Sequence, residues 1–196
     1  MKKIRRALIS VYSKEGLNAL LVKLVKEGVE LVSTGGTAEY IRGQGYECTE
    51  VESVTGYPSI LGGRVKTLHP KIFGGILGRR ELEGDVEEMR KYGIEGIDLV
   101  VVDLYPFEDT VASGATAAEI IEKIDIGGIS LIRAAAKNYN DVVIVASRAE
   151  YSTLYEIILE HGAATTLEER HSLATRAFEV TAGYDRAIHE WFEENN

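Results

Sequence analysis

The sequence has few cysteines and histidines, which limits disulfide formation and metal binding. Its single cysteine, Cys48, has no second thiol to pair with, so redox chemistry and cysteine-ligated zinc are excluded, and Cys48 is predicted to be a strand residue. Of the four histidines, His161, His171 and His189 fall in the C-terminal stretch at no metal-ligand spacing, and His69 before a proline is typical of a turn. We therefore expect no metal and no cofactor.

Long apolar runs are also absent. No stretch approaches the roughly 20 apolar residues that a membrane-spanning helix needs. The basic N-terminus is followed by a short apolar run that reaches polar Ser10 too soon for a signal peptide. The expectation is a cytoplasmic protein that does not engage a membrane.

Positive charge is scarce, with 22 Lys+Arg against 31 Asp+Glu and a net charge of −9. This balance disfavours a nucleic-acid partner, because counterion release needs a basic face. Between Ser53 and Arg80, however, the sequence has no acidic residue. The basic residues of that segment are Arg64, Lys66, Lys71, Arg79 and Arg80. This local excess of positive charge is suited to binding a small anion.

Apolar runs alternate with helical patterns along the 196 residues, of which 45% are hydrophobic. Strands are predicted at 7–11, 29–33, 46–51, 97–104 and 142–146, and helices at 17–25, 38–42, 85–92, 117–123 and 129–137. Everything after residue 149 has helical character. The pattern predicts one α/β domain with a five-stranded, mostly parallel sheet flanked by helices. Residues 1–148 would form its core and 149–196 a helical C-terminal cap.

The stretch from Thr55 to Gly78 is rich in glycine and has no sustained period. It is predicted to be a long loop with short helical pieces, and loops of this length inside compact domains are usually functional. Ligands of open parallel sheets bind beyond the carboxyl ends of the strands. The polar segments expected at that edge are 12–14, 34–37, 64–67, 103–105 and 125–128. They are predicted to converge on one site.

Two of these segments suit a phosphate. Residues 34–37, Thr-Gly-Gly-Thr, lie between a strand and a helix, where backbone N–H groups and hydroxyls can hold an anion. The alternative is a tight turn with a threonine cap. Ser13 is likewise either a site residue or the N-cap of the next helix, and Lys14 either binds the anion or is a solvated charge.

Two further segments suit the chemistry of a reacting group. If their backbone is extended, Arg64 and Lys66 project to one side, where they can clamp an anion or position a proton donor, or merely form a surface cluster. Asp125 is either a helix N-cap or part of an oxyanion site, because the glycines behind it let a ligand approach backbone donors. Lys137 follows an alanine run whose small side chains allow close packing, so it need not be exposed.

Several blocks of the sequence closely resemble, in order, the N-terminal half of the bifunctional purine-biosynthesis proteins, which carries IMP cyclohydrolase activity. The blocks are Ser10 to Lys14, Ser33 to Ala38, Leu61 to Pro70, Leu104 to Phe107, Asp125 to Gly128 and Arg133 to Asn138. The block from Leu61 to Pro70 is very specific. The turn at 34–37 is shared with methylglyoxal synthase-like domains and indicates only the fold.

The resemblance implies a methylglyoxal synthase-like fold and an enzyme of the last step of de novo purine biosynthesis. That step closes 5-formamidoimidazole-4-carboxamide ribonucleotide (FAICAR) to IMP with loss of water. The implied catalytic residues are Lys66, Tyr105, Asp125 and Lys137. The implied substrate-binding residues are Ser10, Tyr12, Ser13, Lys14, Thr34, Gly35, Gly36, Thr37, Arg64, Thr67, Asp103, Ile126, Gly127 and Gly128.

The resemblance also suggests a division of labour. Lys137 and Asp125 would manage the amide proton, Lys66 and the N–H groups after Asp125 would stabilise or protonate the formyl oxygen, and Tyr105 would orient or relay. At Asp103 the sequence departs from the family, which usually has Asn there, and a carboxylate cannot donate as an amide can.

The family's formyltransferase half is missing, so the chain is expected to be a stand-alone cyclohydrolase or an excised domain. A separate AICAR formyltransferase would then be its pathway neighbour. A homodimer stays an open alternative. Two competing functions are a methylglyoxal synthase-like lyase, which would not explain residues 64–70, and a non-catalytic nucleotide-sensing module.

Overall fold

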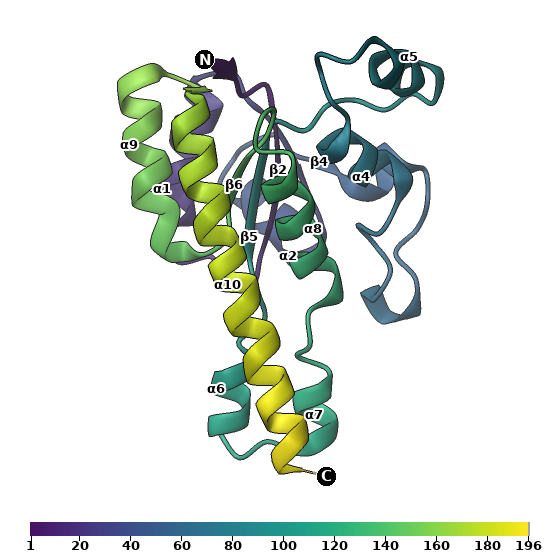
Figure 1. Ribbon diagram of the computed structural model, residues 1–196, viewed down its shortest axis with the longest axis vertical. Coiled ribbons are helices and arrows are strands. Elements are labelled where there is room, and N and C mark those ends of the chain that lie inside the picture. Colours follow the sequence, from purple (N-terminus) through teal and green to yellow (C-terminus); the bar gives the residue numbers. More distant parts are fainter. Residues whose placement is uncertain (196) are drawn as a thin grey trace.

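The computed structural model describes residues 1–195, with a parallel sheet at its centre (Figure 1). The five strands lie in the order β4-β3-β2-β5-β6. They are β2 (Arg6–Val11), β3 (Glu30–Ser33), β4 (Thr49–Glu50), β5 (Leu99–Asp103) and β6 (Val143–Val145). All neighbours in this sheet are parallel. The predicted fold class is therefore confirmed.

The edge strand β4 is shorter than the predicted strand at 46–51. Val51 already begins the short helix α3 (Val51–Thr55), and Cys48 lies just before β4 rather than in it. An edge strand pairs on one side only, so fewer backbone hydrogen bonds hold its ends.

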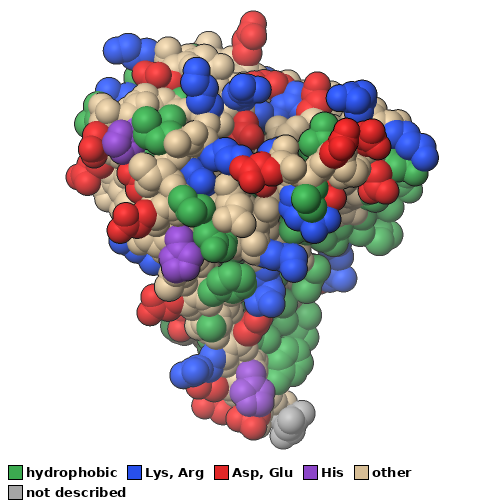
Figure 2. Space-filling model, turned by 45° about the horizontal axis from the view of Figure 1, so that its top comes forward, with side chains coloured by type: hydrophobic (Ala, Val, Ile, Leu, Met, Phe, Trp, Pro, Cys, Tyr) green, Lys and Arg blue, Asp and Glu red, His purple; other side chains and the backbone are tan. Residues whose placement is uncertain are grey.

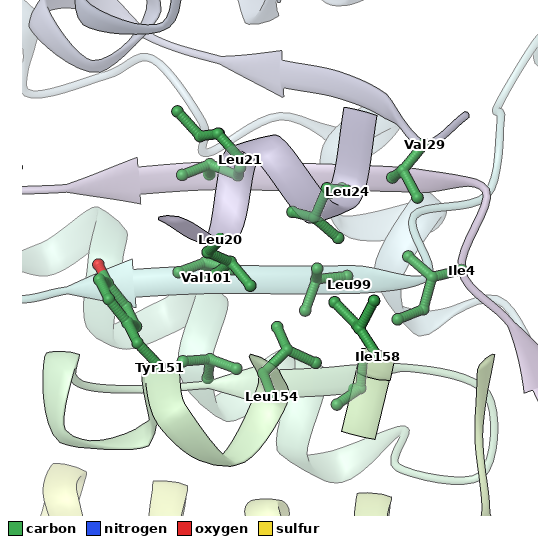
Figure 3. Close-up of a cluster of buried hydrophobic side chains, with 14 of the residues drawn as sticks. Ile4, Leu20, Leu21, Leu24, Val29, Leu99, Val101, Tyr151, Leu154 and Ile158 are labelled. Atoms are coloured by element: carbon green, nitrogen blue, oxygen red, sulfur yellow. The ribbon is translucent and has the colours of Figure 1, made fainter. Parts of the chain in front are cut away.

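Helices cover both faces of the sheet, because the central strands are apolar on both sides. On one face lie α1 (Leu17–Lys26), α2 (Gly35–Gly43) and α9 (Tyr151–His161). Figure 3 shows Leu20 and Leu154 reaching from α1 and α9 toward Leu99 and Val101 of β5. The opposite face packs against α4 (Pro70–Leu77), α8 (Ile126–Lys137) and part of α10.

The long helix α10 (Leu167–Glu194) has 28 residues and begins with a capping box between Thr166 and Glu169. It runs along α8 and continues beyond the carboxyl end of the sheet, where α6 (Phe107–Ala112) and α7 (Ala117–Ile121) lie beside it (Figure 1). Phe107, Ile120 and Trp191 form a separate apolar cluster there. The sequence analysis did not predict α6. Together these helices hold the loops at the carboxyl edge.

A second, antiparallel sheet joins β1 (Lys2–Lys3) to β7 (Ala164–Thr165). The prediction that everything after residue 149 is helical was wrong at β7. A two-residue strand is too short to show alternation, and its partner lies at the other end of the chain.

The remaining elements are α5 (Glu83–Lys91) and the 3₁₀ turns η1 (Leu61–Gly63) and η2 (Arg148–Glu150). The segment 55–78 is thus a loop with short helical pieces, as predicted. Within residues 1–195, no helix combines the length and apolar character that a membrane span requires.

Candidate functional site

The turn after β2 is fixed to the end of β5 by Asp103. Its side-chain Oδ2 accepts a hydrogen bond from the Ser13 N–H at 2.9 Å, and its backbone carbonyl accepts one from the Tyr12 N–H at 3.1 Å. In the first of these bonds the carboxylate acts as an acceptor, a role that the amide oxygen of Asn fills equally well. The second bond uses the backbone and does not depend on the side chain. Asp103 therefore shapes the turn that carries Tyr12, Ser13 and Lys14.

Lys14 folds back over this turn. Its Nζ donates to the carbonyls of Val11 at 2.7 Å and Tyr12 at 3.0 Å. Burial lowers the pKa of Lys14, against the opposing effect of Asp103. An ammonium has three donors, so one remains for an anion. The alternative of a merely solvated Lys14 does not fit this geometry.

Ser13 is not the N-cap of α1. The helix begins at Leu17, and its N-cap is Gly16 with φ of 75°, a left-handed conformation that favours glycine. The Ser13 hydroxyl instead accepts from the Glu15 N–H at 3.3 Å, and Arg148 of η2 donates to the same hydroxyl at 3.3 Å. Sequence reasoning did not find Arg148, because it reaches the turn from a distant part of the chain.

The Thr-Gly-Gly-Thr turn connects β3 to α2. Thr34 occupies the N-cap position, but its side chain makes no capping hydrogen bond. Thr37 is only 4% exposed, and its hydroxyl donates to the Val11 carbonyl at 3.0 Å. That bond ties α2 to the end of β2. The first N–H groups of α2 have no partner within the helix and suit an anion.

Lys66 lies against this turn. A methyl group placed on Gly35 would be 3.5 Å from Lys66 Nζ, and one on Gly63 would be 3.4 Å from it. Burial raises the pKa of the Asp125 carboxyl, and the nearby Lys66 charge is one of the effects that oppose this rise. Lys66 therefore lies near both the Thr-Gly-Gly-Thr turn and Asp125, although the turn and Asp125 are far apart in sequence.

Asp125 is the N-cap of α8. Its Oδ1 accepts from the Gly128 N–H at 2.6 Å, and a methyl group on Gly128 would lie 2.5 Å from Oδ2. Gly127 is similarly close to Thr67, whose hydroxyl would lie 3.2 Å from a methyl group there. Both glycines are thus explained by close approach. The predicted N-cap role is confirmed.

Burial raises the pKa of the Asp125 carboxyl, opposed by the Gly128 N–H, the Tyr105 backbone and the Lys66 charge. The side chain is only partly buried by its neighbours. Helix capping and a chemical role are therefore compatible in this residue.

Tyr12 and Tyr105 form an edge-to-face pair with ring centroids 5.6 Å apart. The Lys123 ammonium lies 5.5 Å from each ring centroid, an arrangement in which the cation attracts both π faces. Burial, with Asp125 and Tyr12 adding to it, raises the pKa of the Tyr105 hydroxyl. The sequence analysis missed Lys123, because nothing in its local pattern distinguishes it from a solvated lysine.

The remaining predicted site residues lie around this cluster. Arg64 forms an ion pair with Glu122, and the two side chains are 66% and 61% exposed. Ile126 is 58% exposed at the first turn of α8. Ser10 is half-buried on β2, one residue before Val11. Gly36 has open space beside it in the turn.

Lys137 is the exception. It ends α8, which Asp125 caps at the other end, and the 12 residues of the helix at about 1.5 Å each separate the two by about 18 Å. Asn138, beside it, donates to the Ile76 carbonyl at 2.8 Å. The structure therefore places Lys137, which is exposed, at the amino edge of the sheet and does not bring it to the other predicted residues.

That amino edge is dominated by paired charges. A cavity of about 810 Å³ opens there, and none of the predicted site residues lines it. Arg6 pairs with Glu30 at 2.9 Å and Lys2 pairs with Asp141 at 2.9 Å. Figure 2 shows acidic and basic side chains interspersed over the upper part of the molecule.

Comparison with known families gives two matches along the chain. Residues 16–130 match the family of the MGS-like domain. The chain belongs to the MGS-like domain family. Residues 135–196 match a second family, described as AICARFT/IMPCHase bienzyme. The MGS-like match thus ends within α8, and α9 and α10 fall in the bienzyme match.

Relatives of this MGS-like domain include the bifunctional purine biosynthesis protein PurH of Bacteroides thetaiotaomicron, 64% identical over 98% of this chain and 38% of that protein. PurH of Bartonella bacilliformis is 47% identical over 100% of this chain and 36% of its own length. The chain thus spans less than two fifths of these relatives. A solved structure titled "Crystal structure of ForH" is 33% identical with a TM-score of 0.83, covering 96% of this chain and 97% of that one. These similarities confirm the family predicted from the sequence blocks.

Proposed function

We propose that this MGS-like domain is an IMP cyclohydrolase that closes FAICAR to IMP. The observation that carries the proposal is the position of Lys66, whose ammonium lies against Gly35 of the anion-binding turn and acts on the Asp125 carboxyl. One site thereby offers a phosphate anchor, an acid and a base. The similarity to PurH proteins supports the same activity.

The substrate's 5′-phosphate binds at the N-terminus of α2, where free backbone N–H groups and the positive end of the helix favour an anion. Lys14 supplies its remaining donor from the neighbouring turn. The imidazole then extends toward the N-terminus of α8, past the Tyr12 and Tyr105 pair. Arg64 lies at the rim and exchanges its exposed partner Glu122 for the substrate.

Ring closure joins two groups already held on one imidazole, so proximity comes largely from the substrate. The carboxamide nitrogen attacks the formyl carbon, a C–N bond forms, and the formyl oxygen becomes a hydroxyl as the attacking nitrogen loses a proton. The hydroxyl then leaves as water, while the nitrogen that carried the formyl group loses its proton and a C=N bond forms. In each of the two stages the enzyme takes one proton from a nitrogen and delivers one to the oxygen.

Asp125 is the base in this scheme, because burial raises its pKa and makes the carboxylate more basic than a solvated one. Lys66 and the N–H groups at the start of α8 stabilise the formyl oxygen as negative charge develops, and Lys66 donates the proton to the departing hydroxyl. Tyr105 orients the reacting groups. Asp125 carries out the amide proton transfer that sequence reasoning had shared with Lys137, since the two are about 18 Å apart in one chain.

The direct test is conversion of FAICAR to IMP by the purified chain, with the product measured by chromatography. Lys66→Met keeps the length of the side chain without its charge and should abolish turnover, whereas the exposed Lys26→Met should not. A triose phosphate offered in parallel tests lyase activity. IMP binding without turnover would support a nucleotide-sensing module and contradict the proposal.

The chain should not transfer a formyl group from 10-formyltetrahydrofolate to AICAR, because the proposal assigns it ring closure alone. Formyl transfer by this chain would contradict that assignment. A formyltransferase must then supply FAICAR. Assembly into a homodimer and a cytoplasmic location stay predictions.

A further inference from the structure

We propose that Tyr184 of α10 is a positioning residue that sets the geometry of Asp125, an inference that rests on the proposed function. Its hydroxyl accepts a hydrogen bond from the Asp125 N–H at 2.9 Å and donates one to the Lys123 carbonyl at 2.6 Å. One hydroxyl thus binds the backbone on both sides of Ile124. These bonds span 59 and 61 residues of sequence.

The backbone that Tyr184 holds carries two side chains of the site. Asp125 caps the N-terminus of α8, so the position of its N–H determines where its carboxylate points relative to Gly128 and Lys66. Lys123 extends from the same segment to lie 5.5 Å from the rings of Tyr12 and Tyr105. Tyr184 therefore anchors the one segment that carries both the Asp125 carboxylate and the Lys123 ammonium that contacts the aromatic pair.

The anchor is itself rigidly held. The Tyr184 ring packs edge-to-face on Phe107 with centroids 6.2 Å apart, and Phe107 packs on Trp191 in the same way. Burial, as the largest cause, raises the pKa of Tyr184 to about 12, so the hydroxyl stays protonated and able to donate near neutral pH. The apolar cluster thus fixes the ring, and the ring fixes the loop.

The origin of this anchor agrees with a specialised role. Asp125 falls in residues 16–130, which match the MGS-like domain, whereas Tyr184 falls in residues 135–196, which match the bienzyme family. Beyond the sheet, α10 packs on α6 and α7, where Trp191 meets Phe107 and Ile120. The same stretch of the helix brings the Tyr184 hydroxyl to the loop of Asp125.

Tyr184→Phe removes the hydroxyl and keeps the packed ring. Thr181→Val is the matched control, because Thr181 is buried on the same helix and its hydroxyl bonds only the Phe178 carbonyl within that helix. With FAICAR as substrate, Tyr184→Phe should lower kcat about tenfold with KM changed less than threefold, since misplacing a reacting group acts mainly on the transition state. Thr181→Val should keep the wild-type kcat.

A double variant separates positioning from general destabilisation. If Tyr184 acts through Asp125, the pair Tyr184→Phe and Asp125→Asn should lose no more turnover than Asp125→Asn alone. Additive losses, or equal losses in Tyr184→Phe and Thr181→Val, would overturn the proposal.

Amide hydrogen exchange at Asp125, measured by NMR, tests the anchor without any activity. Loss of one hydrogen bond should speed this exchange about two- to tenfold in Tyr184→Phe and leave it unchanged in Thr181→Val. Failure of the wild-type chain to cyclise FAICAR would refute the proposed function, and the exchange rate would still decide on the anchor. Unchanged exchange in Tyr184→Phe would overturn the anchor even in an active enzyme.

Discussion

Asp125 and Lys137 lie at opposite ends of the same helix, with Asp125 capping α8 and Lys137 ending it. A helix that leads into a parallel strand runs back across the sheet, from its carboxyl edge to its amino edge. The two residues therefore lie on opposite edges, about 18 Å apart. The family resemblance had suggested that they share a proton transfer, which they cannot do within one chain at this separation.

We accordingly expect Lys137→Ala to keep kcat within about threefold of the wild type, because the lysine does not reach the reacting atoms. Steady-state kinetics of IMP formation measure this. A large loss of activity in Lys137→Ala that is restored when these chains are mixed with Lys66→Ala chains would contradict the expectation. It would mean that Lys137 serves the site of a second copy.

Asp125→Asn should lower turnover at least a hundredfold, since an amide cannot accept the proton, without weakening the fold at pH 7. Burial raises the pKa of Asp125, so the folded state binds this proton more tightly than the unfolded chain, and ionisation costs stability as pH rises. Asn caps helices as well as Asp does. The free energy of unfolding of the variant should therefore equal or exceed that of the wild type at pH 7.

This advantage should shrink as the pH falls through the raised pKa of the folded state and disappear below 3.8, the ordinary pKa of the carboxyl, where both states of the wild type are protonated. Urea unfolding across this pH range provides the measurement. If the free energy of unfolding of Asp125→Asn, relative to that of the wild type, is lower at pH 7 than at pH 4, the shift in the Asp125 pKa has the opposite sign.

Glu122→Gln and Arg64→Ala should change KM in opposite directions. Glu122 competes with the substrate for Arg64, so its neutralisation should lower KM about twofold to fivefold, the range of an exposed ion pair. Loss of Arg64 should raise KM about tenfold. Glu50→Gln breaks the similarly exposed pair with Arg42 and should leave KM unchanged. A higher KM in Glu122→Gln would exclude the competition.

Lys14→Ala should raise KM and change kcat less, because Lys14 holds the phosphate in substrate and transition state alike. A lost charge-assisted contact is worth about 1.5–3 kcal/mol, which lowers affinity by roughly ten- to 150-fold. Calorimetric titration with IMP, beside steady-state kinetics, measures both effects. A variant with normal IMP affinity and low kcat would assign Lys14 to the chemistry instead.

Activity should survive prolonged treatment with a chelator. Among residues 1–195, no group of three or more His, Cys, Asp and Glu side chains is placed to hold a metal ion, and the proposed proton transfers use Asp125 and Lys66 alone. A rate that falls on chelation and returns with a divalent cation would contradict this mechanism.

Much of the site could be predicted from the sequence, because its parts are local. The apolar runs of β2, β3, β5 and β6 indicated buried parallel strands, and such strands bring their following turns to one edge. Gly127 and Gly128 were predicted to let a ligand approach backbone donors, and the structure places the Asp125 carboxylate and the Thr67 hydroxyl close to them. The orientation of α8 also followed from its place before a parallel strand, so Lys137 could have been assigned to the far edge.

The sequence by itself determined the long strands of the parallel sheet, most of the helices that flank it and the turns that follow the strands, since each depends on residues within a few positions of one another. Only the tertiary structure decided which distant groups meet. Lys123 over Tyr12 and Tyr105, Arg148 on Ser13, and the Tyr184 hydroxyl under Asp125 all join segments from separate elements. Such contacts are set by how helices pack across a sheet, and a local pattern holds no record of that packing.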